Sequence, residues 1–248
     1  MKQLRLSGGL ATLEARYRQA IEGQWASGEF LARRLEDEIE RRAQRQLALR
    51  VRRAALTTTK TLEGFDGRFK PTLNRPQVLH LASGDDIRQQ RNVLRCGPTG
   101  VGKSHLAQAL AHAACRQGFD VLFVNTHKML QHLHGGRADG TWAKRFALYL
   151  RPALLVLDDL GLKPLVDPAP ADLYAVSNAR YEGGSMLVTS NRAPTEWPDL
   201  FGNPLLASAG LDRLAHHAEM RVITGRRFRA QGRQPAAKPA GELVKERR

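Results

Sequence analysis

The stretch RCGPTGVGKS, from Arg95 to Ser104, decides the fold class of this 248-residue chain. Its last eight residues fit the pattern G-x-x-x-x-G-K-[ST], which predicts a phosphate-binding loop between a strand and a helix. Glycines let such a loop turn tightly and aim its amide N–H groups at phosphate oxygens, helped by the positive end of the next helix. We therefore expect ATP to bind at Gly97, Pro98, Thr99, Gly100, Val101, Gly102, Lys103 and Ser104.

Two side chains of this loop have roles of their own. Lys103 is expected to place its positive charge on the β- and γ-phosphate oxygens. The Ser104 hydroxyl is expected to be a ligand of Mg²⁺. ATP and Mg²⁺ are therefore the predicted cofactors.

The sequence on both sides of the loop alternates between strand and helix patterns. Apolar strands are predicted at 92–96, 120–125, 153–160, 185–191 and 220–225, and helices at 103–118, 126–136, 141–150, 169–184 and 206–218. This alternation predicts an α/β fold of the P-loop NTPase type, with three layers around a parallel sheet. Arg95 is unusual in a strand covered on both faces, so we expect it near the sheet edge or extending outward.

Two carboxylates end the strand ALLVLDDL at 153–160. The carboxyl ends of parallel strands meet at one edge of a sheet, so these acids should lie near the phosphate loop. Asp158 is expected to hold Mg²⁺ through its water shell, and Asp159 to orient or deprotonate the attacking water. An acid at the second position is usually Glu, and Asp reaches less far, so we expect slow hydrolysis.

Two more polar residues complete the predicted catalytic set. Asn191 ends the strand SMLVTSN, where its amide can position the attacking water or contact the γ-phosphate. Arg213, on a late helix, can act as an arginine finger on ATP held by a neighbouring subunit. The alternative for Arg213 is a surface ion pair with Asp212 or Glu219.

The net charge of +15 is concentrated at the two ends of the chain. Residues 1–60 carry 13 Lys/Arg against 7 Asp/Glu, residues 221–248 carry 9 against 2, and the middle is close to neutral. Basic ends around a catalytic core are typical of proteins that bind nucleic acid, although a solubilising surface is the alternative.

No apolar run approaches the roughly 20 residues that span a membrane. Two cysteines, Cys96 and Cys115, fit a reduced cytosol, and Cys96 should be a small buried residue.

Four regions are predicted along the chain. Residues 1–60 form a small, basic, all-helical domain in which an apolar residue recurs every fourth position at 31, 35, 39, 43, 47 and 51. Six arginines between 41 and 53 either lie on phosphates or form a solvated face. Residues 61–89 form a linker rich in Gly and Pro that ends in an entry helix, 90–229 the ATPase core, and 230–248 a disordered basic tail.

Taken together, the ordered motifs resemble the IstB-like ATP-binding proteins, the helper ATPases of insertion-sequence transposition. The resemblance covers about residues 4–229 and is carried by GPTGVGKSHLAQAL, LLVLDDLGLKPL and RYEGGSMLVTSNRAPTEWPDLFGNPLLASAGLDRLAHHAE. It implies an AAA+ core close to the DnaC-type helicase loaders, without a separate C-terminal lid. By this resemblance, Lys103 and Ser104 would bind the nucleotide, Asp158 would hold Mg²⁺, and Asp159 would activate water. Asn191 would be the first sensor, and Arg213 would be the finger that acts on a neighbour's ATP.

The resemblance also implies a task. It predicts ATP-dependent homo-oligomers on duplex DNA, without strong sequence preference, that target and stimulate the transposase of the same insertion sequence. Three alternatives stay open at this point. A replicative helicase loader would share the core, a DNA scaffold would bind nucleotide with little hydrolysis, and a metabolic P-loop kinase would need neither Asn191 nor Arg213.

Overall fold

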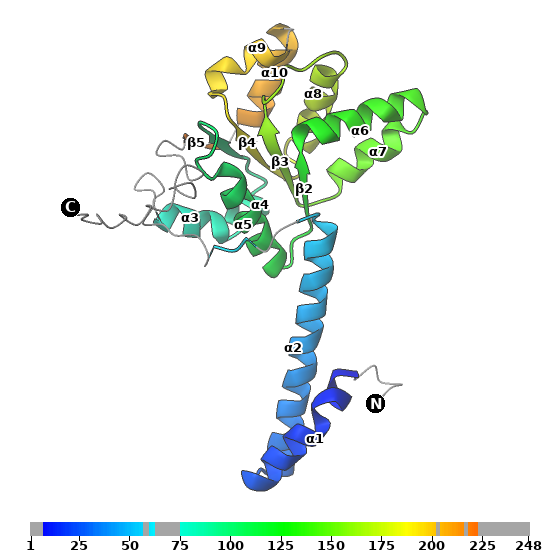
Figure 1. The fold of residues 1–248 in the computed structure, drawn as a ribbon, viewed down its shortest axis with the longest axis vertical. Coiled ribbons are helices and arrows are strands. Elements are labelled where there is room, and N and C mark those ends of the chain that lie inside the picture. The colour runs from blue at the N-terminus through cyan, green and yellow to red at the C-terminus, as the bar shows by residue number, and fades with distance from the viewer. Residues whose placement is uncertain (1–6, 57–59, 63–74, 202–203, 216–217, 223–248) are drawn as a thin grey trace, which may run out of the picture.

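The computed structural model describes residues 7–56, 60–62, 75–201, 204–215 and 218–222. The predicted tail at 230–248 and residues 63–74 of the predicted linker lie outside these residues. The elements, in chain order, are α1 Ser7–Glu22, α2 Ser27–Arg53, α3 Arg75–Ala82, α4 Asp85–Arg88, β1 Val93–Cys96, α5 Lys103–Arg116, β2 Val121–Asn125, α6 Thr126–Ala138, α7 Trp142–Leu150, β3 Leu154–Leu160, α8 Ala169–Arg180, β4 Ser185–Ser190, η2 Pro194–Glu196, α9 Pro198–Phe201, α10 Pro204–Ala215 and β5 Glu219–Val222. The predicted α/β fold is confirmed (Figure 1).

The sheet has five parallel strands in the order β2-β3-β4-β1-β5. Strand β4 therefore lies between β1, which leads into the phosphate loop, and β3, which carries the two acids. All three strands run in the same direction, so the segments that follow them meet at the carboxyl edge of the sheet. Ligands of open α/β sheets bind at this edge.

The central strands β1, β3 and β4 are buried, whereas the edge strand β2 is mostly half-buried. In β3, Leu154 and Val156 belong to the apolar cluster that includes α5, whereas Leu155 and Leu157 belong to the cluster formed with α6, α8 and α10. This split follows from the two-residue period of a strand. A strand covered on both sides reads as a continuous apolar run, which is why LLVL was recognisable in the sequence.

Arg95 is an exception within this core. It lies in β1, next to the edge strand β5, and its side chain is only 2% exposed. The expectation that it extends outward is therefore wrong. The strand positions on either side of it are apolar and buried, so the backbone pairing of β1 carries Arg95 into the interior.

The N-terminal region is a helical hairpin that projects from the core. Helix α2, about 40 Å long at 1.5 Å per residue, extends away from the sheet, and α1 folds back along its outer half (Figure 1). The inner end of α2 is fixed to the core. Ala54 is fully buried, its carbonyl accepts a hydrogen bond from the Phe123 amide at 2.8 Å, and Leu47 and Val51 pack beside α5.

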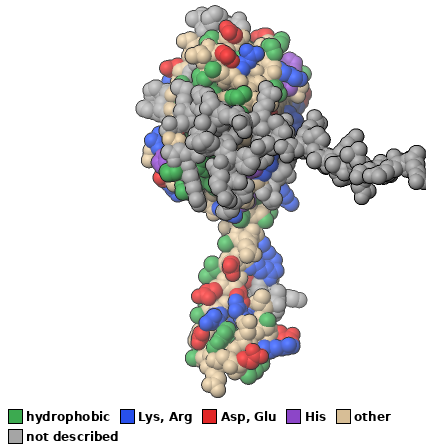
Figure 2. Space-filling model, turned by 60° about the vertical axis from the view of Figure 1, so that its left-hand side comes forward, with side chains coloured by type: hydrophobic (Ala, Val, Ile, Leu, Met, Phe, Trp, Pro, Cys, Tyr) green, Lys and Arg blue, Asp and Glu red, His purple; other side chains and the backbone are tan. Residues whose placement is uncertain are grey.

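The outer part of α2 departs from the simple amphipathic pattern. Leu31, Leu35 and Ile39 are 58%, 48% and 67% exposed, so the apolar face predicted at these positions is not covered by α1. Figure 2 shows hydrophobic side chains on the surface of this hairpin. Helix α1 instead packs on a polar face, where the Arg16 guanidinium bonds the Asp37 carboxylate at 2.6 Å. The helix was predicted correctly, but the sequence pattern does not say what covers its apolar face.

Within the described part of the chain, no helix is both long enough and apolar enough to cross a membrane.

Candidate functional site

The phosphate-binding pattern forms the turn between β1 and α5, at the carboxyl edge of the sheet. Gly100 and Gly102 adopt φ angles of +87° and +91°, which residues with a side chain rarely adopt. Gly102 is the N-cap of α5, and no side chain caps this helix end. The first amide N–H groups of α5 are therefore available to an anion, as the sequence pattern requires.

Lys103 is held inside this loop. Its side chain is 5% exposed, and its Nζ donates hydrogen bonds to the carbonyl oxygens of Gly97 at 2.8 Å and Pro98 at 3.0 Å. Burial lowers the pKa of Lys103, and the charges of Asp159 and Asp158 partly oppose this shift. An ammonium group bonded only to neutral carbonyls has lost part of its hydration, so an arriving phosphate oxygen is a stronger partner for it.

Oxygen ligands for a magnesium ion are present on β3 and α5. Asp158 is 7% exposed, and its Oδ1 accepts a hydrogen bond from the Thr189 hydroxyl at 2.5 Å. Ser104, the second residue of α5, is half-buried next to the loop. Hydroxyl and carboxylate oxygens are the ligands that Mg²⁺ prefers, so these residues fit the predicted ion.

Asp159 occupies an irregular position in β3. Its φ is +59°, and the register with β4 shifts between Leu157 and Leu160. Such a bulge re-aims one side chain of a strand and is common beside functional sites. The Asp159 amide donates to the Thr189 hydroxyl at 2.9 Å, and its side chain borders a cavity of about 420 Å³ that Lys128 and Lys163 also line.

Thr189 is a candidate site residue that the sequence reasoning missed. Its single hydroxyl links Asp158 and Asp159, because it donates to the carboxylate of the first and accepts from the amide of the second. The available signal was a polar residue directly after the apolar run Met186–Val188 of β4, two positions before Asn191. Its hydroxyl fixes the orientation of the predicted magnesium ligand.

Asn191 directly follows β4. Strand β4 lies between β1, which leads into the phosphate loop, and β3, which carries the two acids. Its Oδ1 is buried and has no hydrogen-bond partner among the described residues. A buried amide oxygen without a donor costs free energy, so this atom fits a site that a bound group or water completes. This observation supports the predicted nucleotide site, although the role of Asn191 stays a prediction.

Arg213 lies at the opposite edge of the sheet. Its guanidinium stacks over the Tyr181 ring at 4.4 Å, and its carbonyl and that of Leu214 lie 3.4 and 3.2 Å from the Asn92 Nδ2. Asn92 precedes β1, whereas the phosphate loop follows it. Within the described residues Arg213 forms no ion pair, so the alternative pairing with Asp212 or Glu219 is not found.

The predicted residues therefore fall into two groups. Lys103, Ser104, Asp158, Asp159 and Asn191 meet at the carboxyl edge, and Arg213 does not join them.

Burial raises the pKa of the Cys96 thiol, beside the loop, to about 11. This thiol is neutral at physiological pH, in agreement with its expected role as a small buried residue.

Solved structures with the same core confirm the fold. The chain aligns with the DnaC helicase loader at a TM-score of 0.57 and 21% identity, over 66% of this chain and 97% of that one. It aligns with AMPPCP-bound DnaA from Aquifex aeolicus at a TM-score of 0.56 and 19% identity, over 70% of this chain and 53% of that one. Both are AAA+ P-loop domains.

Sequence relatives are more informative. An ATP-binding protein in an insertion sequence of Mycobacterium tuberculosis is 39% identical, over 94% of this chain and 93% of its own length. The ATP-binding protein of insertion sequence IS21 from Pseudomonas aeruginosa is 33% identical, over 90% of this chain and 84% of its own. The family described as IstB-like ATP binding protein matches residues 1–236. The chain therefore belongs to the IstB-like ATP-binding proteins, the insertion-sequence-associated branch of the AAA+ fold.

Proposed function

We propose that this protein hydrolyses ATP with Mg²⁺, assembles with further copies of itself on duplex DNA, and assists the transposase of its insertion sequence. The bound ion would neutralise charge on the β- and γ-phosphates. Ser104 and Asp158 would hold it, and Lys103 would exchange its loop carbonyls for phosphate oxygens. Asp159 would orient the attacking water, and the unpartnered Oδ1 of Asn191 would accept a hydrogen bond from that water.

One observation carries the proposal of assembly. Arg213 lies at the amino edge of the sheet, whereas the phosphate loop of the same subunit lies at the carboxyl edge. An arginine placed there would act on nucleotide held by another subunit. Its guanidinium stacks on the Tyr181 ring at 4.4 Å, and within the described part of the chain it has no carboxylate partner. ATP bound between two subunits would then join them, and hydrolysis would release them.

A subunit-mixing experiment tests this arrangement. Arg213→Ala removes the proposed finger and leaves its own phosphate loop intact, whereas Asp159→Asn disables its own site and leaves its finger intact. We expect each variant alone to turn over ATP at least about 1000-fold more slowly than wild type, and a mixture of the two to regain part of the activity. Arg151→Ala is the matched control, because Arg151 is exposed and its side chain forms no ion pair with the residues that the structure describes. If the mixture stays as inactive as its parts, the finger does not act between subunits.

Duplex DNA is proposed to bind along the inner half of α2. Arg52 and Arg53 are exposed there, and Figure 2 shows Lys and Arg side chains on the part of the hairpin nearest the core. Replacing both by Gln should weaken DNA binding to all sequences about equally. It should also lower the slope of log affinity against log salt by about 2, since each phosphate contact contributes about 0.9. Arg151→Gln should change neither quantity.

The partner distinguishes the two remaining tasks. A transposition helper should increase strand transfer by the transposase of the same insertion sequence in the presence of ATP and DNA. A helicase loader, which shares the fold, should instead load a replicative helicase onto single-stranded DNA. The relatives named above come from insertion sequences, which favours the first task. If ATP binds but turnover is absent with and without DNA, the protein acts as a nucleotide-binding scaffold.

A further inference from the structure

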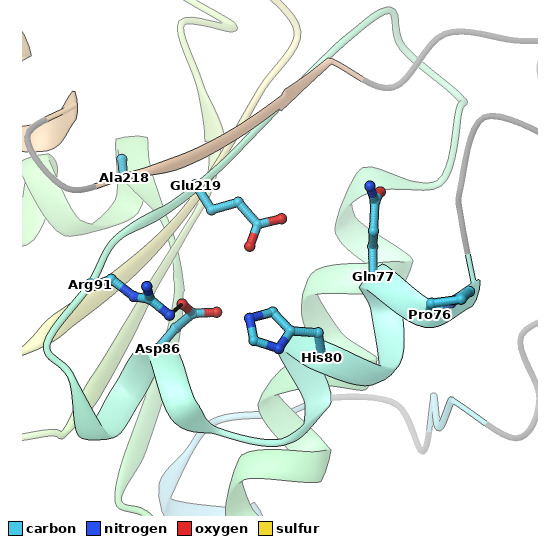
Figure 3. Close-up of a pocket in the computed structure, with 7 residues that line it drawn as sticks. All are labelled: Pro76, Gln77, His80, Asp86, Arg91, Ala218 and Glu219. Atoms are coloured by element: carbon cyan, nitrogen blue, oxygen red, sulfur yellow. Dashed lines mark ion pairs between the residues drawn. The ribbon is translucent and has the colours of Figure 1, made fainter.

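A second pocket lies at the amino edge of the sheet, away from the phosphate loop. It has a volume of about 470 Å³ and is lined by residues of α3, α4 and β5, with Arg91 and Gln77 at its sides (Figure 3). None of these residues takes part in the proposed ATP site. The pocket brings together residues that are far apart in the sequence, such as His80 and Glu219, which are 139 positions apart.

Three side chains with metal-ligand atoms converge in this pocket. One ring nitrogen of His80 and one carboxylate oxygen each of Asp86 and Glu219 lie within 4.8 Å of one another. Figure 3 shows the imidazole and the two carboxylates directed toward the same space. Two ligands of a tetrahedral ion at about 2.1 Å are about 3.4 Å apart, so small side-chain rotations bring these three onto one ion.

Asp86 gives an independent indication of a ligand. Its side chain is 4% exposed, and neither carboxylate oxygen has a hydrogen-bond partner in the described residues. The Arg91 Nη2 lies 2.8 Å from Oδ1 as an ion pair, which leaves Oδ2 without a partner. A buried carboxylate that lacks hydrogen bonds is costly unless a further cation satisfies it.

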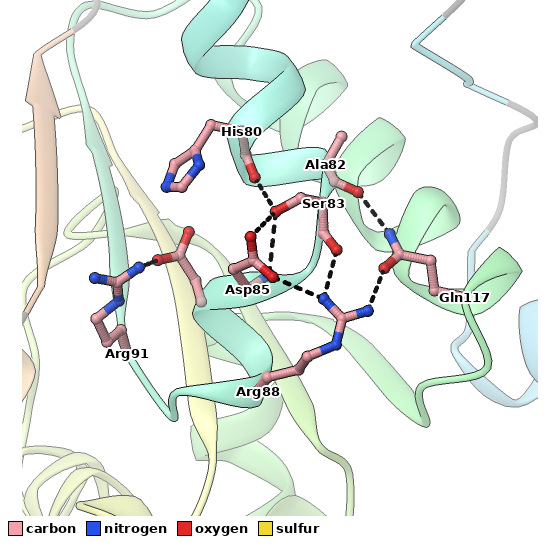
Figure 4. A network of polar contacts seen from close by, with 8 residues as sticks. His80, Ala82, Ser83, Asp85, Arg88, Arg91 and Gln117 are labelled. Carbon is pink, nitrogen blue, oxygen red and sulfur yellow. Dashed lines mark hydrogen bonds and ion pairs between the residues drawn. The ribbon is translucent and has the colours of Figure 1, made fainter.

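The turn that carries two of the ligands is held rigidly (Figure 4). The Ser83 hydroxyl contacts the His80 carbonyl at 2.6 Å and the Asp85 carboxylate at 2.8 Å. Arg88 bonds the Ser83 carbonyl at 2.8 Å and also contacts Gln117 at the end of α5. Preorganised ligands lose little freedom when an ion binds, so this network favours binding.

The backbones of Asp86 and Glu219 are also held by hydrogen bonds. The Ser185 hydroxyl, at the start of β4, donates to the Asp86 carbonyl at 2.9 Å. The Glu219 amide donates to the Asn92 carbonyl at 2.9 Å, which sets the first residue of β5 against β1. Asp86 and Glu219 are therefore positioned against strands of the sheet, and His80 is positioned by α3 and the turn that follows it.

We propose that His80, Asp86 and Glu219 bind one divalent transition-metal ion, with Zn²⁺ as the best match. An imidazole nitrogen with two carboxylate oxygens suits Zn²⁺, whereas Mg²⁺ and Ca²⁺ prefer oxygen ligands alone. His80 is exposed, which gives the ion a path of entry, and the pocket leaves a fourth position for water. The ion would join α3 and α4 to the start of β5. The proposal of this metal site does not depend on the proposed function.

Metal binding by the full chain tests this proposal. The protein is treated with chelator, freed of nucleotide, and titrated with Zn²⁺ and with Co²⁺. We expect one ion per chain, a rise of a few degrees in the thermal midpoint, and a Co²⁺ spectrum without a thiolate charge-transfer band. The spectrum separates this site from Cys96 and Cys115, which are buried thiols.

Matched variants locate the site. His80→Asn and Glu219→Gln should each weaken Zn²⁺ binding about 100-fold, because even outer-shell partners contribute 10–100-fold. The controls are His134→Asn and Glu182→Gln, which change exposed residues of the same types and should bind like wild type. Circular dichroism of each metal-free variant checks that it is folded. The proposal is overturned if no stoichiometric ion binds, if both ligand variants bind normally, or if the Co²⁺ spectrum shows a thiolate ligand.

Discussion

The core and the helical hairpin of this protein are organised in opposite ways. The core encloses apolar side chains such as Leu155 and leaves polar groups at the edges of its sheet. The hairpin encloses Arg34 and Glu38, which are 7% and 5% exposed, and leaves Leu35 at the surface. The core therefore gains stability from apolar burial, whereas the described side chains of the two hairpin helices are joined by polar contacts such as the Arg16–Asp37 ion pair.

This difference has a practical meaning. An exposed apolar face on a projecting helix pair adds little to the stability of a single chain, whereas the buried strands of the core determine it. The two regions should therefore respond differently to the same substitution. Three matched pairs of variants and one titration measure this difference, from the largest expected effect to the smallest.

Leucine truncation should give the largest contrast. Leu155→Ala opens a cavity in a fully buried position and should lower the free energy of unfolding by about 2–5 kcal/mol. Leu35→Ala, at a side chain that is 48% exposed, should stay within about 0.5 kcal/mol. Denaturation with guanidinium chloride measures both. Equal losses would mean that the apolar face of α2 is covered in solution.

Buried arginines give the second contrast. Arg180 is 2% exposed and donates to the carbonyl oxygens of Tyr149, Leu150, Ala153 and Ser185. Arg180→Met should cost about 2–4 kcal/mol, because it leaves those oxygens buried without a donor.

The matching hairpin variant is Arg34→Met. Arg34 donates to the Thr12 hydroxyl at 2.6 Å and lies 3.6 Å from the Asp37 carboxylate. Its loss should cost about 1 kcal/mol in the same denaturation experiment. A larger cost for Arg34 than for Arg180 would show that the hairpin stabilises the whole chain.

The two threonines that join polar groups test function instead of stability. Thr189→Val removes the hydroxyl that orients Asp158, and it should slow ATP turnover about 10–100-fold with little change in fold. Thr12→Val removes the hydroxyl that contacts Arg34 and Asp37 in the hairpin, and it should leave turnover unchanged. Steady-state phosphate release measures both variants. Unchanged turnover in Thr189→Val would remove this residue from the proposed site.

The smallest effect is a pH dependence in the hairpin. Hydrogen bonds from Arg16 hold the pKa of Asp37 below its usual value, so the folded state favours the ionised carboxylate. This contribution is present above the unfolded pKa of about 3.9 and is lost as the pH falls through the folded value. The difference in thermal midpoint between wild type and Asp37→Asn should therefore shrink from about pH 6 to about pH 3. A difference that grows toward acid would contradict the assignment.

Much of the core could be predicted from the sequence because its signals are local. The glycines of the phosphate loop, the continuous apolar runs such as Leu154–Leu157 and the acids that end β3 each reflect a requirement of the backbone or the solvent at that position. The parallel order then placed Lys103, Asp158 and Asn191 at one edge, as expected. Their catalytic roles stay predictions.

Other features were decided by contacts between segments far apart in the chain. Thr189 became a partner of Asp158 because β4 lies beside β3, and the burial of Arg95 follows from its pairing on both sides. The sequence by itself determined the fold class, the phosphate loop and the helical nature of α2, since these depend on local periodicity and backbone geometry. Only the tertiary structure decided which face of α2 meets α1, which edge Arg213 occupies, and that His80, Asp86 and Glu219 converge. No local sequence pattern encodes contacts between residues that are about 20, 30 or 140 positions apart.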